Sequence, residues 1–236
     1  METKLTFEIS AQPDLTTCGP TCLHALYRYY GDDISLQQVI EEAPKLDDGG
    51  TLAVLLGIHA LKRGYQAKLY TYNLQVFDPT WFTTEGVDLA ERLKMQAQYK
   101  RDIKLRIATK AYLEFLAGGG LIHFEDLTSG LIRRHLKRSI PILTGLSSTY
   151  LYRAMRESPV EEKDDDLRGF PTGHFTVLCG YDSDSRAVLI ADPFWPNPFA
   201  EAHQYVVGVD RAICSILLGI LTYDANLLII EPAESA

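Results

Sequence analysis

The stretch of residues 12–31, QPDLTTCGPTCLHALYRYYG, constrains the fold most, because it places a cysteine at the start of a helix. Turn formers come first, and Pro20 is tolerated in a first helical turn, where its missing N–H would have no partner. Apolar residues then recur at helical spacing, and Gly31 can end the helix in a left-handed conformation. The peptide dipoles and free N–H groups of a helix N-terminus favour a thiolate at Cys18 over a thiol. Cysteine needs that help to be a strong nucleophile at neutral pH.

Composition narrows the class of protein. The chain has 236 residues, of which 46% are hydrophobic and 23% charged, enough for one large domain with its own core. Its net charge of −8, without a block of Lys and Arg, argues against nucleic acid and anionic membrane surfaces as partners. The N-terminus lacks the pattern of a signal peptide, and the longest apolar run, residues 212–221, is about half of a membrane span. Because four cysteines do not form a disulfide framework in a chain this long, we expect a soluble, cytoplasmic protein with reduced thiols.

The pattern places helices mostly early in the chain and strands mostly late, which indicates an α+β fold rather than a doubly wound one. Ser35 and Thr51 are candidate N-caps, and residues 47–50 are expected to form a turn. The clearest element is a β-hairpin over residues 174–194, with its turn at residues 182–185. Further helices are expected over residues 35–43, 51–62, 128–138 and 210–218, and further strands over residues 4–9, 65–72, 121–125, 140–146 and 226–231.

Two segments stand apart from this pattern. Residues 87–116 are rich in good helix formers and in charge, which predicts a long helical segment outside the core, with a break near Thr109 and an end at Gly118. Residues 147–172 lose periodicity, which predicts an exposed loop with one helical turn. Its acidic run, residues 161–166, is interpreted as solvated, and the alternative is a flap that biases the protein toward basic substrates.

Four side chains supply the parts that thiol chemistry requires. These parts are a nucleophile, a base, a group that orients the base and a donor for the developing oxyanion. Cys18 is the candidate nucleophile. His174 opens the first strand of the hairpin and Asp192 ends the second, so strand pairing returns the carboxylate to the imidazole that it would orient. Gln12 and the N–H of Cys18 are the oxyanion candidates.

Each of these residues also has a structural interpretation when taken alone. A cysteine is more often a buried apolar residue, and an Asp before proline is more often a turn residue. The order of all four favours the catalytic interpretation. Cys22 and His24 raise the alternative of a metal site with Cys18, but their spacing places them on different helix faces. We therefore expect no metal or organic cofactor. The residues expected in core or structural roles are Cys22, Cys179, Cys214 and His59.

The segment Q-x5-C-G-P-x-C-L followed by YYG, the later GHFTVLCGYD and the ADPF resemble the papain-like cysteine peptidases that cleave double-glycine leaders from bacteriocin precursors. Residues 49–70 and 140–146 extend the resemblance. It is to a stand-alone relative, because the ABC exporter domains to which many of these peptidases are fused are absent from this sequence. The resemblance implies a single papain-like domain over residues 1–236, with the nucleophile helix packed on an antiparallel sheet. A helical insertion would span about residues 73–120 and a loop insertion about residues 147–172.

The resemblance also implies roles. Cys18 would be the nucleophile, His174 the general base, Asp192 the orienting acid and Gln12 the oxyanion donor of a cysteine peptidase. The substrate would be a peptide or small amide, and a partner could come from a peptide-tailoring or export system. An acyl or peptidyl transferase on the same scaffold, or a non-catalytic peptide-binding module, remains open. Thr17 departs from the family pattern, which often has an acidic residue there. We expect residues 87–116 and 147–172 to wall the substrate cleft, and an interface with a partner or with a second copy of the chain is the alternative.

Overall fold

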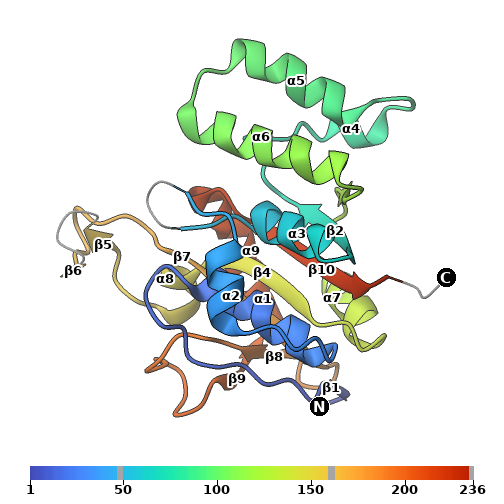
Figure 1. Ribbon diagram of the computed structural model, residues 1–236. Coiled ribbons are helices and arrows are strands. Elements are labelled where there is room, and N and C mark those ends of the chain that lie inside the picture. Colours follow the sequence, from blue (N-terminus) through green and yellow to red (C-terminus); the bar gives the residue numbers. More distant parts are fainter. Residues whose placement is uncertain (47–49, 159–162, 234–236) are drawn as a thin grey trace.

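An eight-stranded sheet organises the chain (Figure 1). The computed structural model describes residues 1–46, 50–158 and 163–233. The strand order is β3-β2-β10-β4-β7-β8-β9, with β1 paired to β7, and β5 and β6 form a separate pair. Within the described ranges, β2 and β3 are parallel and the other paired strands are antiparallel. The strands are β1 Thr3–Lys4, β2 Tyr65–Thr71, β3 Leu121–His123, β4 Ile142–Ser147, β5 Glu157–Ser158, β6 Lys163–Asp164, β7 Gly173–Asp182, β8 Ala187–Ala191, β9 Gln204–Gly208 and β10 Asn226–Pro232.

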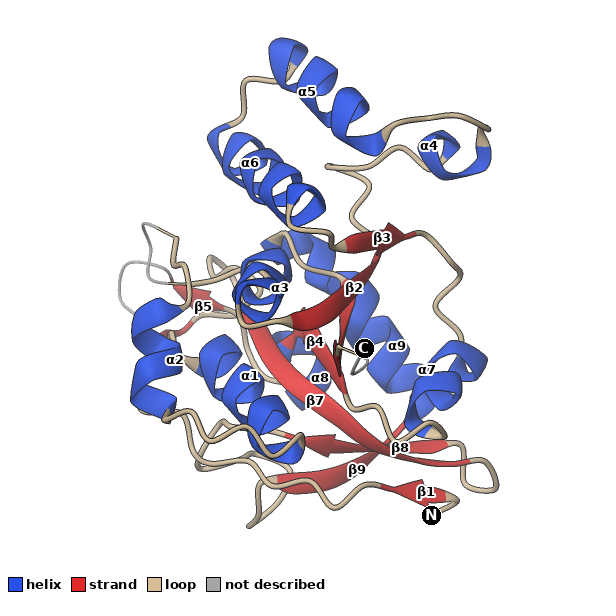
Figure 2. Cartoon of the chain, turned by 45° about the vertical axis from the view of Figure 1, so that its right-hand side comes forward, coloured by secondary structure: helices blue, strands red, loops and turns tan. Residues whose placement is uncertain are grey.

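Helices cover both faces of this sheet, with α1 to α3 on one side and α7 and α9 on the other (Figure 2). Strands β4 and β8 are buried along their whole length, which explains why they appear in the sequence as continuous apolar runs rather than as alternating ones. The helices are α1 Cys18–Tyr29, α2 Leu36–Glu42, α3 Ala53–Lys62, α4 Thr80–Thr83, α5 Leu89–Tyr99, α6 Ile103–Ala117, α7 Ser129–Leu136, α8 Ser148–Tyr152, α9 Val209–Leu218 and the 3₁₀ helix η1 Gly219–Thr222.

Local signals in the sequence give most helix ends correctly. Helix α1 begins at Cys18, and Gly31 has a φ of +78° just beyond its end. Ser35 caps α2 by accepting a hydrogen bond from the N–H of Gln38 at 3.1 Å. The expected cap at Thr51 is wrong, because α3 begins at Ala53, whose N–H donates instead to Oδ1 of Asp224 at 3.1 Å.

The charge-rich segment is two helices rather than one. The chain breaks between α5 and α6, where Asp102 accepts from the N–H of Leu105 at 2.8 Å and so caps α6; Thr109 lies inside α6. The expectation that the segment lies outside the core is wrong for α6, because the Phe115 side chain is fully buried. A Cβ added at Gly57 of α3 would lie 2.7 Å from the Phe115 ring, so α6 packs closely on α3. In Figure 1, α4, α5 and α6 form an arm above α3 and β2.

Several elements differ in extent from the expectation. Strand β1 covers only two residues, and β9 was not expected. The loop over residues 147–172 contains α8 and the short β5–β6 pair. The predicted turn at residues 47–50 and the acidic run at residues 161–166 lie partly outside the described residues. Among the helices that are described, none has the length and apolar character needed to cross a bilayer.

Candidate active site

Cys18 is the first residue of α1 and is partly exposed. The turn before it is held by Asp14, whose Oδ1 accepts from the N–H and the hydroxyl of Thr16 at 2.8 Å each. Gly19 follows the cysteine, and a Cβ there would lie 2.6 Å from Cγ2 of Thr51 and 3.2 Å from the ring of Phe175. A glycine is therefore required for the N-terminus of α1 to approach β7 and the start of α3.

One turn further along α1, a second cysteine ties this helix to the sheet. The thiol of Cys22 donates to the carbonyl of Phe175 in β7 at 3.3 Å. Phe175 is the neighbour of His174, so this bond fixes the helix relative to the strand that carries the imidazole. Burial raises the pKa of the Cys22 thiol well above its usual range, which suits the core role expected for it.

The β7–β8 hairpin brings His174 and Asp192 together. Val177 of β7 pairs with Ala191 of β8, and Asp192 comes directly after that strand. Nε2 of His174 lies 2.8 Å from Oδ1 of Asp192. Because Nε2 is engaged by the carboxylate, Nδ1 is the ring nitrogen left to interact with Cys18, whose side chain contributes to the raised pKa of His174.

Two tyrosines complete the surroundings of the carboxylate. Asp192 is fully buried, and its Oδ2 accepts from the hydroxyls of Tyr152 and Tyr205 at 2.6 Å each. Its Oδ1 also accepts from the N–H of Phe194 at 2.9 Å. Tyr152 and Tyr205 come from α8 and β9, and no sequence motif marks either of them. The local signal available for β9 is the run of an aromatic and two β-branched residues over residues 205–207.

These contacts set the charges of the pair. Burial opposes ionisation of Asp192, but the charge of His174 and the hydrogen bonds from the imidazole and both tyrosines outweigh it and lower the pKa of Asp192. Burial likewise opposes protonation of His174, and the interactions with Asp192 and Cys18 outweigh it and raise the pKa of His174. The site therefore favours a carboxylate next to an imidazolium, the state that stabilises a neighbouring thiolate.

Gln12 lies beside the Asp192 loop. Its main-chain N–H donates to the carbonyl of Pro193 at 2.9 Å, and its side-chain Nε2 donates to the carbonyl of Asp14 at 2.7 Å. Its Oε1 is buried and has no hydrogen-bond partner among the described residues. An amide nitrogen carries two hydrogens, so the bond to Asp14 orients Nε2 and leaves a second N–H on the same atom.

Of the remaining cysteines and histidines, His203 touches this cluster, with its Nδ1 2.9 Å from the main-chain carbonyl of Asp192, whereas Cys179, Cys214 and His59 do not belong to it. Cys179 is buried in β7, and burial raises the pKa of its thiol to about 12. Cys214 is exposed, so the expected core role is wrong; α9 buries the stripe formed by Val209, Ala212, Ser215 and Ile216, and Cys214 lies off it. His59 is structural, bonded to the Tyr27 hydroxyl at 2.8 Å. Among the described residues, no group of three or more His, Cys, Asp and Glu side chains could hold a metal ion.

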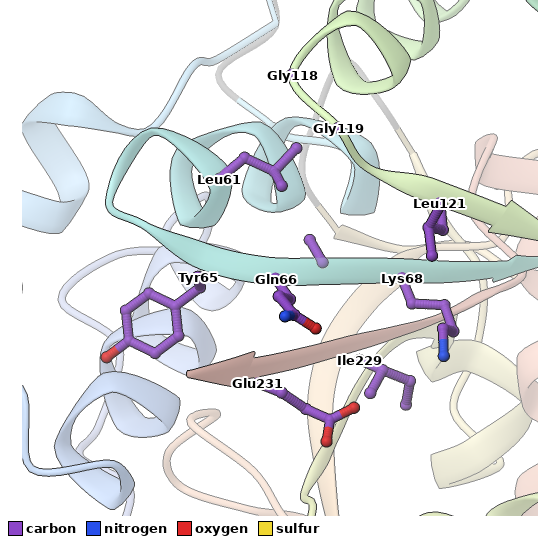
Figure 3. Close-up of a pocket in the computed structure, with 10 residues that line it drawn as sticks. Leu61, Tyr65, Gln66, Lys68, Gly118, Gly119, Leu121, Ile229 and Glu231 are labelled. Carbon is purple, nitrogen blue, oxygen red and sulfur yellow. The ribbon is translucent and has the colours of Figure 1, made fainter. Parts of the chain in front are cut away.

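A hollow elsewhere on the molecule is not part of this site. A cavity of about 390 Å³ lies along β2 and β10, beside the turn at Gly118 and Gly119 (Figure 3). Its polar lining includes Gln66, Lys68 and Glu231. Neither Cys18 nor the His174–Asp192 pair lines it, so it offers no nucleophile next to a base.

Comparisons with known proteins identify the family. A model of the peptidase C39-like family matches residues 4–206, whereas no curated protein matches the chain. One similar solved structure is the peptidase domain of Streptococcus ComA, a bifunctional ABC transporter involved in quorum sensing (14% identity, 96% of this chain and 98% of that chain covered, TM-score 0.44). Another is a double-glycine motif protease from an AMS/PCAT transporter in complex with the leader peptide (14%, 99% and 96%, 0.46). A third is a putative C39-like peptidase from Bacillus anthracis (13%, 98% and 98%, 0.49).

The family match spans β1 through most of β9, and so includes α1 and the β7–β8 hairpin. In the structure these elements have the arrangement that the sequence resemblance implied: a cysteine helix packed on an antiparallel sheet whose hairpin carries the histidine. The chain therefore belongs to the peptidase C39-like family and has the papain-like α+β fold.

Proposed function

We propose that this protein is a cysteine peptidase in which the Cys18 thiolate attacks the carbonyl of a peptide or small amide bond. The observation that carries the proposal is the pairing of His174 with Asp192 through Nε2, which leaves Nδ1 for Cys18, the other side chain that raises the pKa of His174. A nucleophile, a base and a group that orients the base are the parts that such catalysis requires.

The proposed reaction has two steps. Sγ of Cys18 forms a bond to the carbonyl carbon, the carbon–nitrogen bond breaks, and the imidazolium of His174 gives its Nδ1 proton to the leaving amine. Neutral His174 then takes a proton from water, whose oxygen attacks the thioester and releases the carboxylic acid and the Cys18 thiolate. Asp192 keeps its charge throughout and stabilises the imidazolium.

The tetrahedral intermediate of each step carries a negative oxygen, for which two donors are proposed. One is the main-chain N–H of Cys18, since the first N–H groups of a helix have no partner within the helix. The other is the second N–H on Nε2 of Gln12, whose orientation is set by Asp14. Donors positioned in this way act on the transition state rather than on the resting enzyme.

The test is selective alkylation of the thiols by iodoacetamide, followed by mass spectrometry between pH 5 and 8. We expect Cys18 to be labelled far faster than Cys214, which is exposed and serves as the internal control. The His174→Ala variant should lose this advantage. Labelling of Cys18 at or below the rate of Cys214 would contradict the proposal.

Hydrolysis and transfer are then separated by their products. A precursor peptide that carries a leader is the first substrate to test, because the sequence resemblance is to leader peptidases. We expect the free carboxylic acid as the product, both with and without an added primary amine. An amide product that forms in proportion to the added amine would assign the same residues to an acyl or peptidyl transferase.

A further inference from the structure

A wide apolar cleft lies beside the proposed catalytic residues. Its volume is about 610 Å³, within the usual range of ligand sites. The walls come from α6, from the loop before β7, from η1 and the residue after it, and from the segment before α3. The lining residues are Leu46, Leu52, Ile103, Lys104, Ile107, Phe170, Pro171, Leu221, Thr222 and Tyr223.

Large apolar side chains from segments far apart in sequence are exposed in this cleft. The exposed fractions are 74% for Ile103, 63% for Phe170 and 57% for Leu221. Single exposed apolar residues are ordinary, but a group that gathers in one concavity indicates a binding surface. Burying these side chains against a ligand would remove apolar area from water, and this provides the free energy for binding.

The cleft reaches the neighbours of both Cys18 and His174. On one side Pro171 precedes His174 by three residues, and a Cβ at the intervening Gly173 would lie 2.6 Å from the hydroxyl of Thr222. On the other side the wall residue Leu52 follows Thr51, the residue that a Cβ at Gly19 would meet at 2.6 Å. The cleft wall is therefore in close contact with the neighbours of both Cys18 and His174.

Hydrogen bonds hold the walls in place. The hydroxyl of Tyr223 donates to Oδ1 of Asp102 at 3.0 Å, and Asp102 caps α6. The carbonyl of Tyr223 accepts from the side chain of Asn73 at 3.0 Å. On the opposite wall, the N–H of Phe170 donates to the carbonyl of Glu157 at 2.9 Å. The cleft is thus preformed, which lowers the entropic cost of binding.

The charge of the lining argues against basic ligands. Lys104 is the charged side chain among the lining residues, and it is a cation. Of the described part of the acidic run, Asp165 is bonded to Nε of Arg168 at 2.6 Å and also accepts from the N–H groups of Leu167 and Arg168. That carboxylate therefore holds the loop together.

We propose that this cleft is a specificity subsite that takes a bulky apolar side chain, such as Leu, Ile or Phe, of a peptide substrate near the bond that Cys18 attacks. The inference rests on the proposed function, because it assigns the substrate class of the same site. An apolar pocket distinguishes substrate side chains by their size. One methylene group in such a side chain changes the reaction rate by roughly tenfold or more.

The experiment uses iodoacetyl peptide amides as probes on the full chain. In each probe a Leu or an Ala stands first, second or third after the iodoacetyl group, with Gly at the other positions. The rate at which mass spectrometry detects labelling of Cys18 is divided by the rate with plain iodoacetamide. We expect a Leu probe to react roughly tenfold or more faster than its Ala partner in at least one position.

Paired variants tie the preference to the cleft. Ile103→Ser together with Phe170→Ser should remove the Leu preference and leave the plain iodoacetamide rate unchanged, since both side chains are largely exposed and Cys18 is not among the residues that line the cleft. Tyr99→Ser is the matched control, because Tyr99 is 80% exposed on α5 of the same arm and does not line the cleft. It should keep the preference.

The outcomes separate this inference from the proposed function. Slow labelling by plain iodoacetamide would contradict the function, whereas fast labelling without a Leu preference would contradict the subsite alone. A Leu preference that survives in the double variant would place the selecting surface elsewhere. If the double variant keeps the Leu preference but changes its oligomeric state in size-exclusion chromatography, the cleft is an interface between copies of the chain rather than a substrate subsite.

Discussion

The two tyrosine hydroxyls on Asp192 lead to the sharpest prediction. Tyr152→Phe and Tyr205→Phe each remove one hydroxyl from Oδ2 of a fully buried carboxylate and keep the ring. The rings also pack on neighbours, with Tyr152 stacked on Phe194 at 6.1 Å between centroids and Tyr205 against Phe199 at 5.3 Å. Because phenylalanine retains this packing, the variants isolate the hydrogen bonds.

The expected loss of stability follows from the charge of the acceptor, which is the Asp192 carboxylate. A hydrogen bond to a charged group contributes about 1.5–3 kcal/mol, so each single variant should lower the free energy of unfolding by about that amount at pH 7. In the double variant Oδ2 has no remaining partner among the described residues. The loss should therefore exceed the sum of the single losses, because a buried carboxylate oxygen is then unpaired.

The same bonds lower the pKa of Asp192. One pKa unit corresponds to about 1.36 kcal/mol, so each lost hydroxyl should raise the pKa of the folded state by about one to two units. A carboxyl with a lowered folded pKa contributes stability above its unfolded pKa and loses it as the pH falls through the folded pKa. In the variants Asp192 should become protonated at higher pH, and the imidazolium of His174 then loses the carboxylate that stabilises it beside Cys18.

The assays are urea unfolding at pH 7 and the rate of Cys18 alkylation between pH 4 and 8. Tyr150→Phe is the control, because Tyr150 lies on the same helix α8 and its ring packs under Arg211 rather than on Asp192. The reasoning is refuted if the double variant keeps the wild-type acid limb of alkylation and loses no more stability than Tyr150→Phe does.

Three further predictions follow from single contacts. Gln12→Ala should leave alkylation of Cys18 nearly unchanged while lowering turnover of a cleaved peptide roughly a hundredfold or more; an equal fall in both rates would remove Gln12 from the oxyanion hole. Gly19→Ala should cost about 1–3 kcal/mol in urea unfolding, because its Cβ would lie 2.6 Å from Cγ2 of Thr51. Burial raises the pKa of Asp224 to about 7. Between about pH 4 and pH 7 the folded protein therefore holds a proton on Asp224 that the unfolded chain has released. The contribution of Asp224 to the free energy of unfolding should fall as the pH rises through this range. Asp224→Asn should remove that decline, seen as a smaller difference between urea midpoints at pH 5 and pH 8; an unchanged difference would contradict it.

The features that the sequence predicts well are those whose causes lie within a few residues. Ser35 caps a helix through the N–H of Gln38, and Gly31 takes the left-handed conformation just beyond α1. The hairpin is of the same kind, since a short turn joins two apolar strands and thereby fixes which residues pair. That pairing is why His174 and Asp192 could be placed together before the structure was known.

Features with distant causes could not be obtained in this way. The cap of α3 is Asp224, 171 residues from Ala53 in the chain, whereas the local candidate Thr51 donates its hydroxyl to the carbonyl of Pro44. The carboxylate of Asp192 shows the same limit. Its bond to His174 comes from the hairpin, but Tyr152 is 40 residues away from it in sequence. No pattern around either residue marks that contact.

Helix α6 shows how one misplaced break blurs the two faces of a helix that was expected to wall the substrate cleft. With a single helix over residues 87–116, its apolar positions cannot be divided between a face that packs on the fold and a face that lines the cleft. With the helix restarted at Asp102, Leu105, Tyr112 and Phe115 form a buried face. Ile103 and Ile107, one turn apart, lie on another face and line the cleft. A helix whose packing on α3 is already complete has no structural need of a second apolar face, and this is why that face is better explained by a ligand than by the fold.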